Sequence, residues 1–248
     1  MSVRRRAVVT GAASGIGAAT MLELAVRGYD VVAVDIDLAG AEATVRRASA
    51  IGGRHLAVQA DVAEESALVA AFAAAHAFLG GLDALATCAG IADSTPFMDV
   101  AVNTFRRVYD VNVIGTFLAM REAARFMQPG SRICTVASVA GLRGGGLMGT
   151  AAYASSKGAV LALTKNAARS LADQGISVNA VAPGATLTPM IAEAWKNEAI
   201  RSLVESLSAQ HRTAAPEEIA RTIAFLLSPD ASIMTGATLV ADGGMLMY

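Results

Sequence analysis

The sequence predicts a doubly wound α/β fold, in which helices cover both faces of a parallel, seven-stranded sheet. Short runs rich in valine and alanine alternate with longer helical patterns along the whole chain, which is the signature of repeated strand–helix units. The strand-like runs are almost continuously apolar, as strands buried on both faces must be. A glycine-rich turn follows the first run, where this architecture joins its first strand to its first helix.

The predicted elements follow in chain order. The strands are residues 7–10, 31–35, 56–60, 84–88, 132–138, 177–182 and 238–241. The helices are residues 15–27, 38–50, 64–79, 102–127, 152–173 and 216–227. Two stretches interrupt the alternation, a glycine-rich loop at 141–150 and an insertion at about 186–212. Both follow the carboxyl ends of strands, where ligands bind in open α/β sheets, so we expect them to wall a substrate site.

Composition narrows the possible function classes. With 248 residues and 54% hydrophobic content, residues 1–248 are expected to form a single domain with a sizeable core. Twenty basic and twenty-one acidic side chains give a net charge of −1, which disfavours nucleic acid as a partner. The apolar helical stretch 67–79 is shorter than the roughly 20 residues of a membrane span.

Targeting, redox and metal signals are weak. The basic run 4–6 is followed by an apolar stretch that stops at Gly11 without a cleavage-site pattern, so we interpret it as a charged lead-in to the first strand. Cys88 and Cys134 are far apart and form no C-x-x-C pair, and the three histidines lack metal-ligand spacing. We therefore expect a cytoplasmic protein with no metal site and no membrane segment.

The glycine-rich turn predicts a dinucleotide site. Residues 10–17 read Thr-Gly-Ala-Ala-Ser-Gly-Ile-Gly, and glycines at a strand-to-helix turn let the backbone approach a pyrophosphate that the helix N-terminus favours. The expected contacts are Gly11, Ser14, Gly15, Ile16 and Gly17. Asp35 ends the second strand, where a carboxylate binds both ribose hydroxyls and repels a 2′-phosphate, so it selects NAD over NADP. The nearby Asp37 is the alternative ribose ligand.

A second motif predicts proton transfer. Tyr153 and Lys157 are four residues apart and therefore share one face of a helix. A free phenol titrates near about pH 10, and a neighbouring cation lowers its pKa towards the working range. Ser138, at the end of the fifth predicted strand, offers a hydroxyl to polarise the same carbonyl oxygen.

Taken together, the motifs resemble those of the short-chain dehydrogenase/reductase family from one end of the chain to the other. They occur in family order: Thr10–Gly17, Asp61-Val62, Cys88-Ala89-Gly90, Asn112, Ser138, Tyr153–Lys157 and Pro183-Gly184. The resemblance implies a Rossmann-type sheet, a hydride transfer between NAD (NADH) and an alcohol or ketone carbon, and a homotetramer.

The resemblance also assigns roles to single residues. Asp61 and Val62 would flank the adenine, Ala89 and Gly90 would lie beside the cofactor, and Asn112 would hold a water in a proton relay. Lys157 would also hold the nicotinamide ribose. In the segment that begins Pro183-Gly184, the Thr186 backbone and the Thr188 side chain would grip the carboxamide.

The sequence departs from the family pattern in two places. Thr87 and Cys88 stand where family members commonly have two asparagines, and we interpret Cys88 as a small packing residue. The spacing from Ser138 to Tyr153 is longer than usual and carries three glycines at 144–146. This loop is expected to reshape the pocket.

The substrate is expected to be a neutral, fairly apolar alcohol or ketone. The candidate pocket residues are apolar and include no evident cation: Leu142, Leu147, Met148, Met190, Ile191 and Trp195. One alternative is a 3-oxoacyl thioester reductase that uses NADH or NADPH and docks an acidic carrier protein on a basic patch. That patch would draw on Arg121, Arg125, Arg143 and Arg169. A second alternative is a non-catalytic protein that senses NAD, which would have no need of the tuned phenol.

Overall fold

The core of the molecule is one seven-stranded sheet, all of whose strand pairs are parallel. The computed structural model describes residues 4–145 and 150–247. The strands, in the spatial order β3-β2-β1-β4-β5-β6-β7, confirm the predicted doubly wound fold. They are β1 (Arg5–Thr10), β2 (Tyr29–Asp35), β3 (His55–Gln59), β4 (Leu82–Thr87), β5 (Met127–Val136), β6 (Ser177–Pro183) and β7 (Thr238–Ala241).

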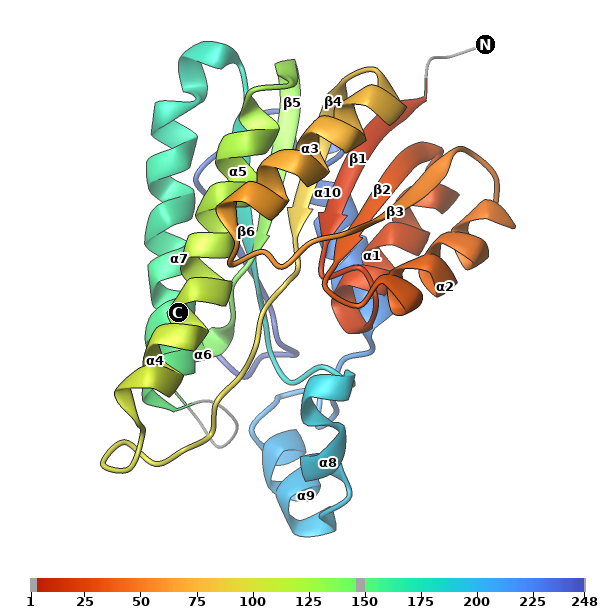
Figure 1. The fold of residues 1–248 in the computed structure, drawn as a ribbon. Helices are drawn as coiled ribbons and strands as arrows, with labels where there is room; N and C mark the ends of the chain where they lie inside the picture. Colours follow the sequence, from red (N-terminus) through yellow and green to blue (C-terminus); the bar gives the residue numbers. More distant parts are fainter. Residues whose placement is uncertain (1–3, 146–149, 248) are drawn as a thin grey trace.

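Helices cover both faces of this sheet (Figure 1). One layer holds α1 (Gly15–Val26), α2 (Leu38–Ser49) and α10 (Pro216–Leu226). The other holds α3 (Glu65–Leu79), α4 (Val102–Tyr109), α5 (Gly115–Ala124) and α7 (Ala151–Ser170). Single 3₁₀ turns, η2 (Ala172–Gln174) and η4 (Pro229–Ala231), follow α7 and α10.

Two of the hydrophobic clusters follow from the alternation of side chains along the strands. Val8 and Leu85 point to one face and pack in a cluster with Phe72 of α3. Val9 points to the other face and packs in a cluster with Met21 of α1. Because successive strand residues face opposite sides, a strand buried under both helix layers must be apolar throughout, as the sequence analysis assumed.

The segment 102–127 is not the single helix that its pattern predicted. It contains α4, a π-helical turn η1 (Asp110–Ile114) and α5, and Met127 already belongs to β5. Met127 pairs with Leu82 upstream of an irregularity in the β4–β5 register, and its side chain is buried in the first core. Long-range strand pairing therefore overrides the local helical pattern at this position.

The fifth strand is also shifted from its predicted bounds of 132–138. It ends at Val136, and Ser138 instead begins a short helix, α6 (Val139–Arg143), by accepting a hydrogen bond from the Ala140 amide at 3.1 Å. The predicted loop 141–150 therefore starts inside a helix. This cap orients the Ser138 backbone just beyond the carboxyl end of the sheet.

The insertion at about 186–212 is mostly helical. It carries η3 (Pro189–Ile191), α8 (Ala192–Trp195) and α9 (Glu198–Ser206), which lie beyond the carboxyl ends of the strands (Figure 1). The Asn197 side chain begins α9 by accepting hydrogen bonds from the Ala199 and Ile200 amides at 3.0 and 3.3 Å. We call these three elements the α8–α9 lobe.

Candidate active site

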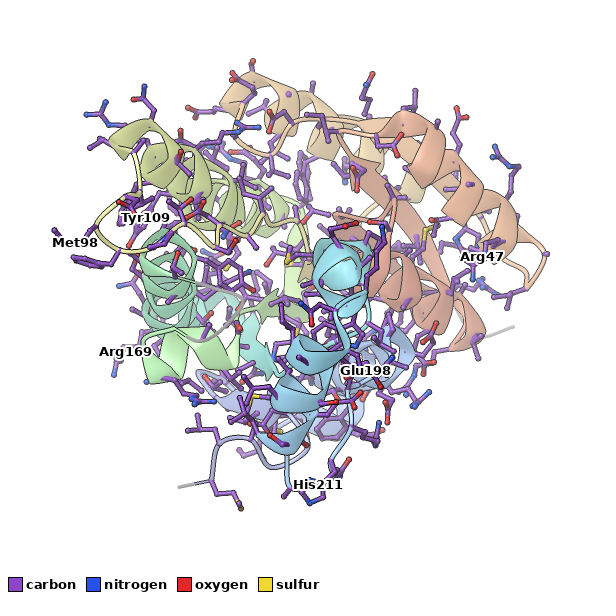
Figure 2. All side chains as sticks on the ribbon, turned by 90° about the horizontal axis from the view of Figure 1, so that it is seen from below. Arg47, Met98, Tyr109, Arg169, Glu198 and His211 are labelled. Atoms are coloured by element: carbon purple, nitrogen blue, oxygen red, sulfur yellow. The ribbon has the colours of Figure 1, made fainter. Side chains whose placement is uncertain are left out.

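A cavity of about 410 Å³ lies between the carboxyl ends of the strands and the α8–α9 lobe. Figure 2 views the molecule from this side, with α9, which carries the labelled Glu198, in the foreground. Each residue that the sequence analysis expected to bind the cofactor lines this cavity, and so does Ser138. Tertiary structure thus gathers motifs that are dispersed over most of the chain.

The glycine-rich turn has the shape of a phosphate cradle. Gly11 has a φ of +70°, and a Cβ there would lie 2.6 Å from the Ala89 backbone nitrogen. A Cβ on Gly17 would collide with the Gly11 carbonyl oxygen. Ser14 begins α1 without a side-chain hydrogen bond, so the first amides of the helix face the cavity with no capping oxygen. Such unpaired amides, together with the helix dipole, bind anions, so this turn fits a dinucleotide phosphate.

Asp35 and Asp37, which the sequence left as alternative ribose ligands, have different surroundings. Asp35 lines the cavity, and its two carboxylate oxygens accept hydrogen bonds from the Ala13 and Asp37 amides at 2.9 and 3.0 Å. Asp37 instead begins α2 by accepting a hydrogen bond from the Gly40 amide at 3.1 Å, and it is not among the lining residues. Of the two, only Asp35 is placed to meet a ribose.

The cavity wall around Asp61 contains an ion pair that sequence reasoning missed. Arg107 of α4 lines the cavity and donates to Asp61 at 3.1 Å. Burial would raise the pKa of the Asp61 carboxyl, but hydrogen bonds from the Ala63 amide and Arg107 outweigh it and lower that pKa. No local pattern marks Arg107, because its partner is 46 residues away.

Ser138, Tyr153 and Lys157 also line the cavity. The Lys157 ammonium donates to the Val136 carbonyl at 2.8 Å and lies 5.8 Å from the centre of the Tyr153 ring. Burial lowers the pKa of Lys157 to about 8. Burial also raises the pKa of Tyr153, and a hydrogen bond to Ser138 offsets only part of that increase. The pKa of the phenol is therefore raised, and not lowered towards the working range as its spacing from Lys157 had predicted, because burial outweighs the other effects. The phenol of this acid–base centre is protonated at neutral pH.

Asn112 does not line the cavity. Its side chain is buried in η1, where the amide oxygen accepts from the Ile91 amide at 2.9 Å and the amide nitrogen donates to Ser156 at 3.0 Å. A Cβ on Gly90 would lie 3.2 Å from that amide oxygen and 3.4 Å from the Lys157 nitrogen. In this structure Asn112 braces the segment at Gly90 against α7.

The replacement of the usual asparagines leaves Cys88 on the cavity wall. Burial raises the pKa of the Cys88 thiol to about 12. Because the thiolate is the reactive form, this sulfur is chemically quiet. The neighbouring Thr87 hydroxyl is buried and has no hydrogen-bond partner within residues 4–145 and 150–247.

The substrate end of the cavity is mostly apolar. Met190, Ile191 and Trp195 of the α8–α9 lobe line it as expected, whereas Leu142 does not. Leu147 and Met148 lie outside the described residues. Arg143, at the end of α6, also lines the cavity. The sequence analysis had found no cation here, since it assigned Arg143 only to a surface patch.

Comparisons with known proteins place the chain in a family. A family model described as enoyl-(acyl carrier protein) reductase matches residues 11–246. The chain is 40% identical over 243 residues to cis-4-hydroxycyclohexanecarboxylate dehydrogenase of Sinomonas cyclohexanicum, covering 97% of this chain and 96% of that protein. The chain belongs to the short-chain dehydrogenase/reductase family. Membership confirms the resemblance seen in the sequence and implies a nicotinamide dinucleotide cofactor, NAD or NADP.

Other family members match over a similar length. The chain is 40% identical to 3beta-hydroxysteroid dehydrogenase 1 of Eggerthella lenta, covering 97% of this chain and 93% of that protein. It is 39% identical to an uncharacterized short-chain type dehydrogenase/reductase of Sinorhizobium fredii, of whose length it spans only 43%. A crystal structure of a dehydrogenase/reductase from Sinorhizobium meliloti superposes with a TM-score of 0.91 at 36% identity, covering 99% and 97% of the two chains.

Within residues 4–145 and 150–247, no helix is long and apolar enough to cross a membrane. The same residues contain no group of three or more histidine, cysteine or acidic side chains arranged to hold a metal ion.

Proposed function

We propose that this short-chain dehydrogenase/reductase interconverts a secondary alcohol and a ketone on a fairly apolar ring compound and uses NAD. The observation that carries the proposal is the convergence of Ser138, Tyr153 and Lys157 on one cavity wall. An acid–base pair beside a hydroxyl donor suits the removal or delivery of a proton at an alcohol oxygen.

In the oxidation, Ser138 and Tyr153 hold the alcohol oxygen, and Tyr153 takes its proton. The oxidised dinucleotide, when bound, would supply the hydride acceptor. Lys157 places a cation 5.8 Å from the centre of the phenol ring, and a nearby cation favours the phenolate form that burial disfavours. In the reduction, Tyr153 returns the proton to the carbonyl oxygen.

The preference for NAD rests on the Asp35 carboxylate. Two backbone amides hold it on the cavity wall, so it has little freedom to turn away from a cofactor. Two unit charges 4 Å apart repel by about 4 kcal/mol at an effective dielectric constant of 20. Arg107, the basic side chain at that end, is already paired with Asp61. A 2′-phosphate would therefore meet a fixed negative charge that Arg107, engaged by Asp61, is not free to offset.

The preference for a ring compound rests on the apolar walls and on the relatives. Side chains of the α8–α9 lobe give the substrate end a hydrophobic surface, and such surfaces bind apolar ligands. The similar proteins described above act, by their names, on a hydroxycyclohexane carboxylate and on a hydroxysteroid. Substituted ring alcohols are thus the first substrates to test.

The deciding experiment compares NADH and NADPH binding by fluorescence in the wild type and in Asp35→Asn, followed by an NAD-coupled screen of ring alcohols. We expect the wild type to prefer NADH and the variant to lose most of that preference. Tyr153→Phe is the control in the screen and should abolish turnover without abolishing NADH binding. Equal or tighter NADPH binding by the wild type would overturn the cofactor assignment.

The two alternatives are also testable. A non-catalytic NAD sensor would bind NADH but turn over no alcohol in the screen. A carrier-dependent thioester reductase would need an open basic patch, yet Arg121 is paired with Glu65 and Glu122, and Arg125 is paired with Glu122. Higher activity on carrier-bound ketones than on free ones would nevertheless favour it.

We also propose that the protein forms a homotetramer, as the family resemblance implies. Ile114 and Phe117, at the start of α5, are 44% and 43% exposed, and exposed apolar side chains of this kind favour association. Sedimentation equilibrium, compared between the wild type and Phe117→Asp, would test this assembly.

A further inference from the structure

Arg143 is fixed on the same short helix that begins at Ser138. The helix ends in a left-handed turn at Gly144, whose φ is +80°, and the Gly144 and Gly145 amides both donate to the Ala140 carbonyl, at 3.0 and 2.9 Å. Its Gly141 lies directly against the backbone of α7, where a Cβ would come within 2.6 Å of the Gly158 nitrogen. The backbone of Arg143 therefore has a defined position relative to both Ser138 and the Tyr153-bearing helix.

The cations that line the cavity differ in what they already bind. Lys157 donates to the Val136 carbonyl, and Arg107 is paired with Asp61. Arg143 has no hydrogen-bonding or ion-pair partner in the part of the chain that the structure describes, and its side chain is exposed at the cavity wall. The acidic residues that line the cavity, Asp35 and Asp61, belong to the adenosine end. A guanidinium thus stands in an otherwise apolar substrate wall.

The length of α6 sets the scale of the group that this guanidinium could meet. Ser138 precedes α6 and Arg143 ends it, and five helical residues span about 7.5 Å at 1.5 Å per residue. Both residues line the cavity, so a substrate whose reacting oxygen is held by Ser138 can present a group several bonds away, on the far side of a six-membered ring, to the long Arg143 side chain.

We infer that Arg143 is an anion subsite that binds a carboxylate of the substrate. This inference rests on the proposed function and narrows its substrate class to ring alcohols that carry an acidic group opposite the hydroxyl. The planar guanidinium matches a carboxylate with two parallel hydrogen bonds. The phosphates of an acyl thioester carrier lie a whole pantetheine arm from the reacting carbon, so the short distance favours the carboxylate.

The test compares 4-hydroxycyclohexanecarboxylate with its neutral methyl ester as substrates of the NAD-loaded protein. The variants are Arg143→Gln and Arg143→Lys, and the matched control is Arg169→Gln, an exposed arginine of α7 that does not line the cavity and is labelled in Figure 2. We expect the ratio of kcat/KM for the acid to that for the ester to fall about 10- to 100-fold in Arg143→Gln, because hydrogen bonds to charged groups are worth about 1.5–3 kcal/mol. In Arg143→Lys this ratio should fall less than in Arg143→Gln, and in Arg169→Gln it should equal the wild-type ratio.

A binding measurement separates failure of the inference from failure of the proposed function. Unreactive cyclohexanecarboxylate is titrated into NAD-saturated protein by calorimetry at low and high salt. We expect binding that weakens with salt and is lost in Arg143→Gln. If ring alcohols are oxidised but neither the ratio nor this binding depends on Arg143, the anion subsite is wrong. If no ring alcohol is oxidised but the Arg143-dependent binding persists, the subsite stands and the proposed reaction is wrong.

Discussion

Replacing Gly141 by alanine tests whether the close contact between α6 and α7 sets the active-site geometry. In an ordinary helix this change would stabilise the protein by about 1 kcal/mol, because alanine has the higher helix propensity. Here the new Cβ would lie 2.6 Å from the Gly158 nitrogen and 2.6 Å from the Lys157 carbonyl carbon. Both are backbone atoms, so no side-chain rotation relieves the overlap.

The expected magnitude follows from that geometry. Ordinary van der Waals contact would require a separation about 1 Å greater, and overpacking of this kind typically costs about 1–3 kcal/mol. After subtraction of the propensity gain of about 1 kcal/mol, we expect Gly141→Ala to lose up to about 2 kcal/mol of unfolding free energy. A displacement of about 1 Å between catalytic groups can cost about 100-fold in rate, and α6 begins at Ser138 whereas α7 carries Tyr153 and Lys157.

The assay combines urea denaturation with steady-state kinetics on whichever ring alcohol the screen identifies. Gly158→Ala is the matched control, because its Cβ would lie 3.3 Å from the Gly141 oxygen, a contact that a shift of a few tenths of an ångström relieves. We expect Gly141→Ala to lower kcat far more than Gly158→Ala does. A Gly141→Ala protein that is more stable than the wild type and has the same kcat would refute the argument that this contact positions Ser138.

Three further results are expected. Lys157→Met should raise the unfolding free energy at pH 7 by about 1–2 kcal/mol, since burying the Lys157 charge costs about 3 kcal/mol and losing its hydrogen bond to Val136 offsets part of the gain. Because the folded pKa of Lys157 is about 8, below its usual value, the difference in denaturation midpoint between the variant and the wild type should shrink as pH rises from about 8 to 10.5. Cys88 in the folded protein should resist iodoacetamide at pH 8 for hours, as followed by mass spectrometry, because its pKa is raised to about 12; rapid labelling would contradict that raised pKa. Asp83→Asn should lower the unfolding free energy by about 1–2 kcal/mol at neutral pH, since the Asp83 carboxylate accepts three hydrogen bonds from Arg6, each of 2.8 Å. These hydrogen bonds outweigh the effect of burial and lower the pKa of Asp83. The stabilisation is therefore present at neutral pH and is lost as pH falls through that folded pKa. Measuring the unfolding free energy of the wild type and of Asp83→Asn at decreasing pH would detect this loss.

Residue patterns of short range determined the fold class. Apolar runs such as Val31–Val34 are strand-forming in themselves and have no polar face, so burial between two helix layers follows directly from their composition. The glycine-rich turn and the Tyr153–Lys157 spacing are likewise local. Their chemistry depends on residues within one turn or one helix, which a sequence displays without knowledge of the rest of the chain.

Only the tertiary structure distinguishes the surroundings of Asp35 and Asp37, because Asp35 lines the cavity whereas Asp37 accepts a hydrogen bond from the Gly40 amide of α2. The tertiary structure also explains why the helix predicted at 102–127 does not reach its predicted end. Met127 pairs instead with Leu82, a strand residue 45 positions earlier in the chain. Long-range packing likewise places Arg107 and Arg143 on the cavity wall. The partner of Arg107 and the residues that line the cavity with Arg143 come from distant elements, and a one-dimensional pattern holds no information about which distant elements the core brings together.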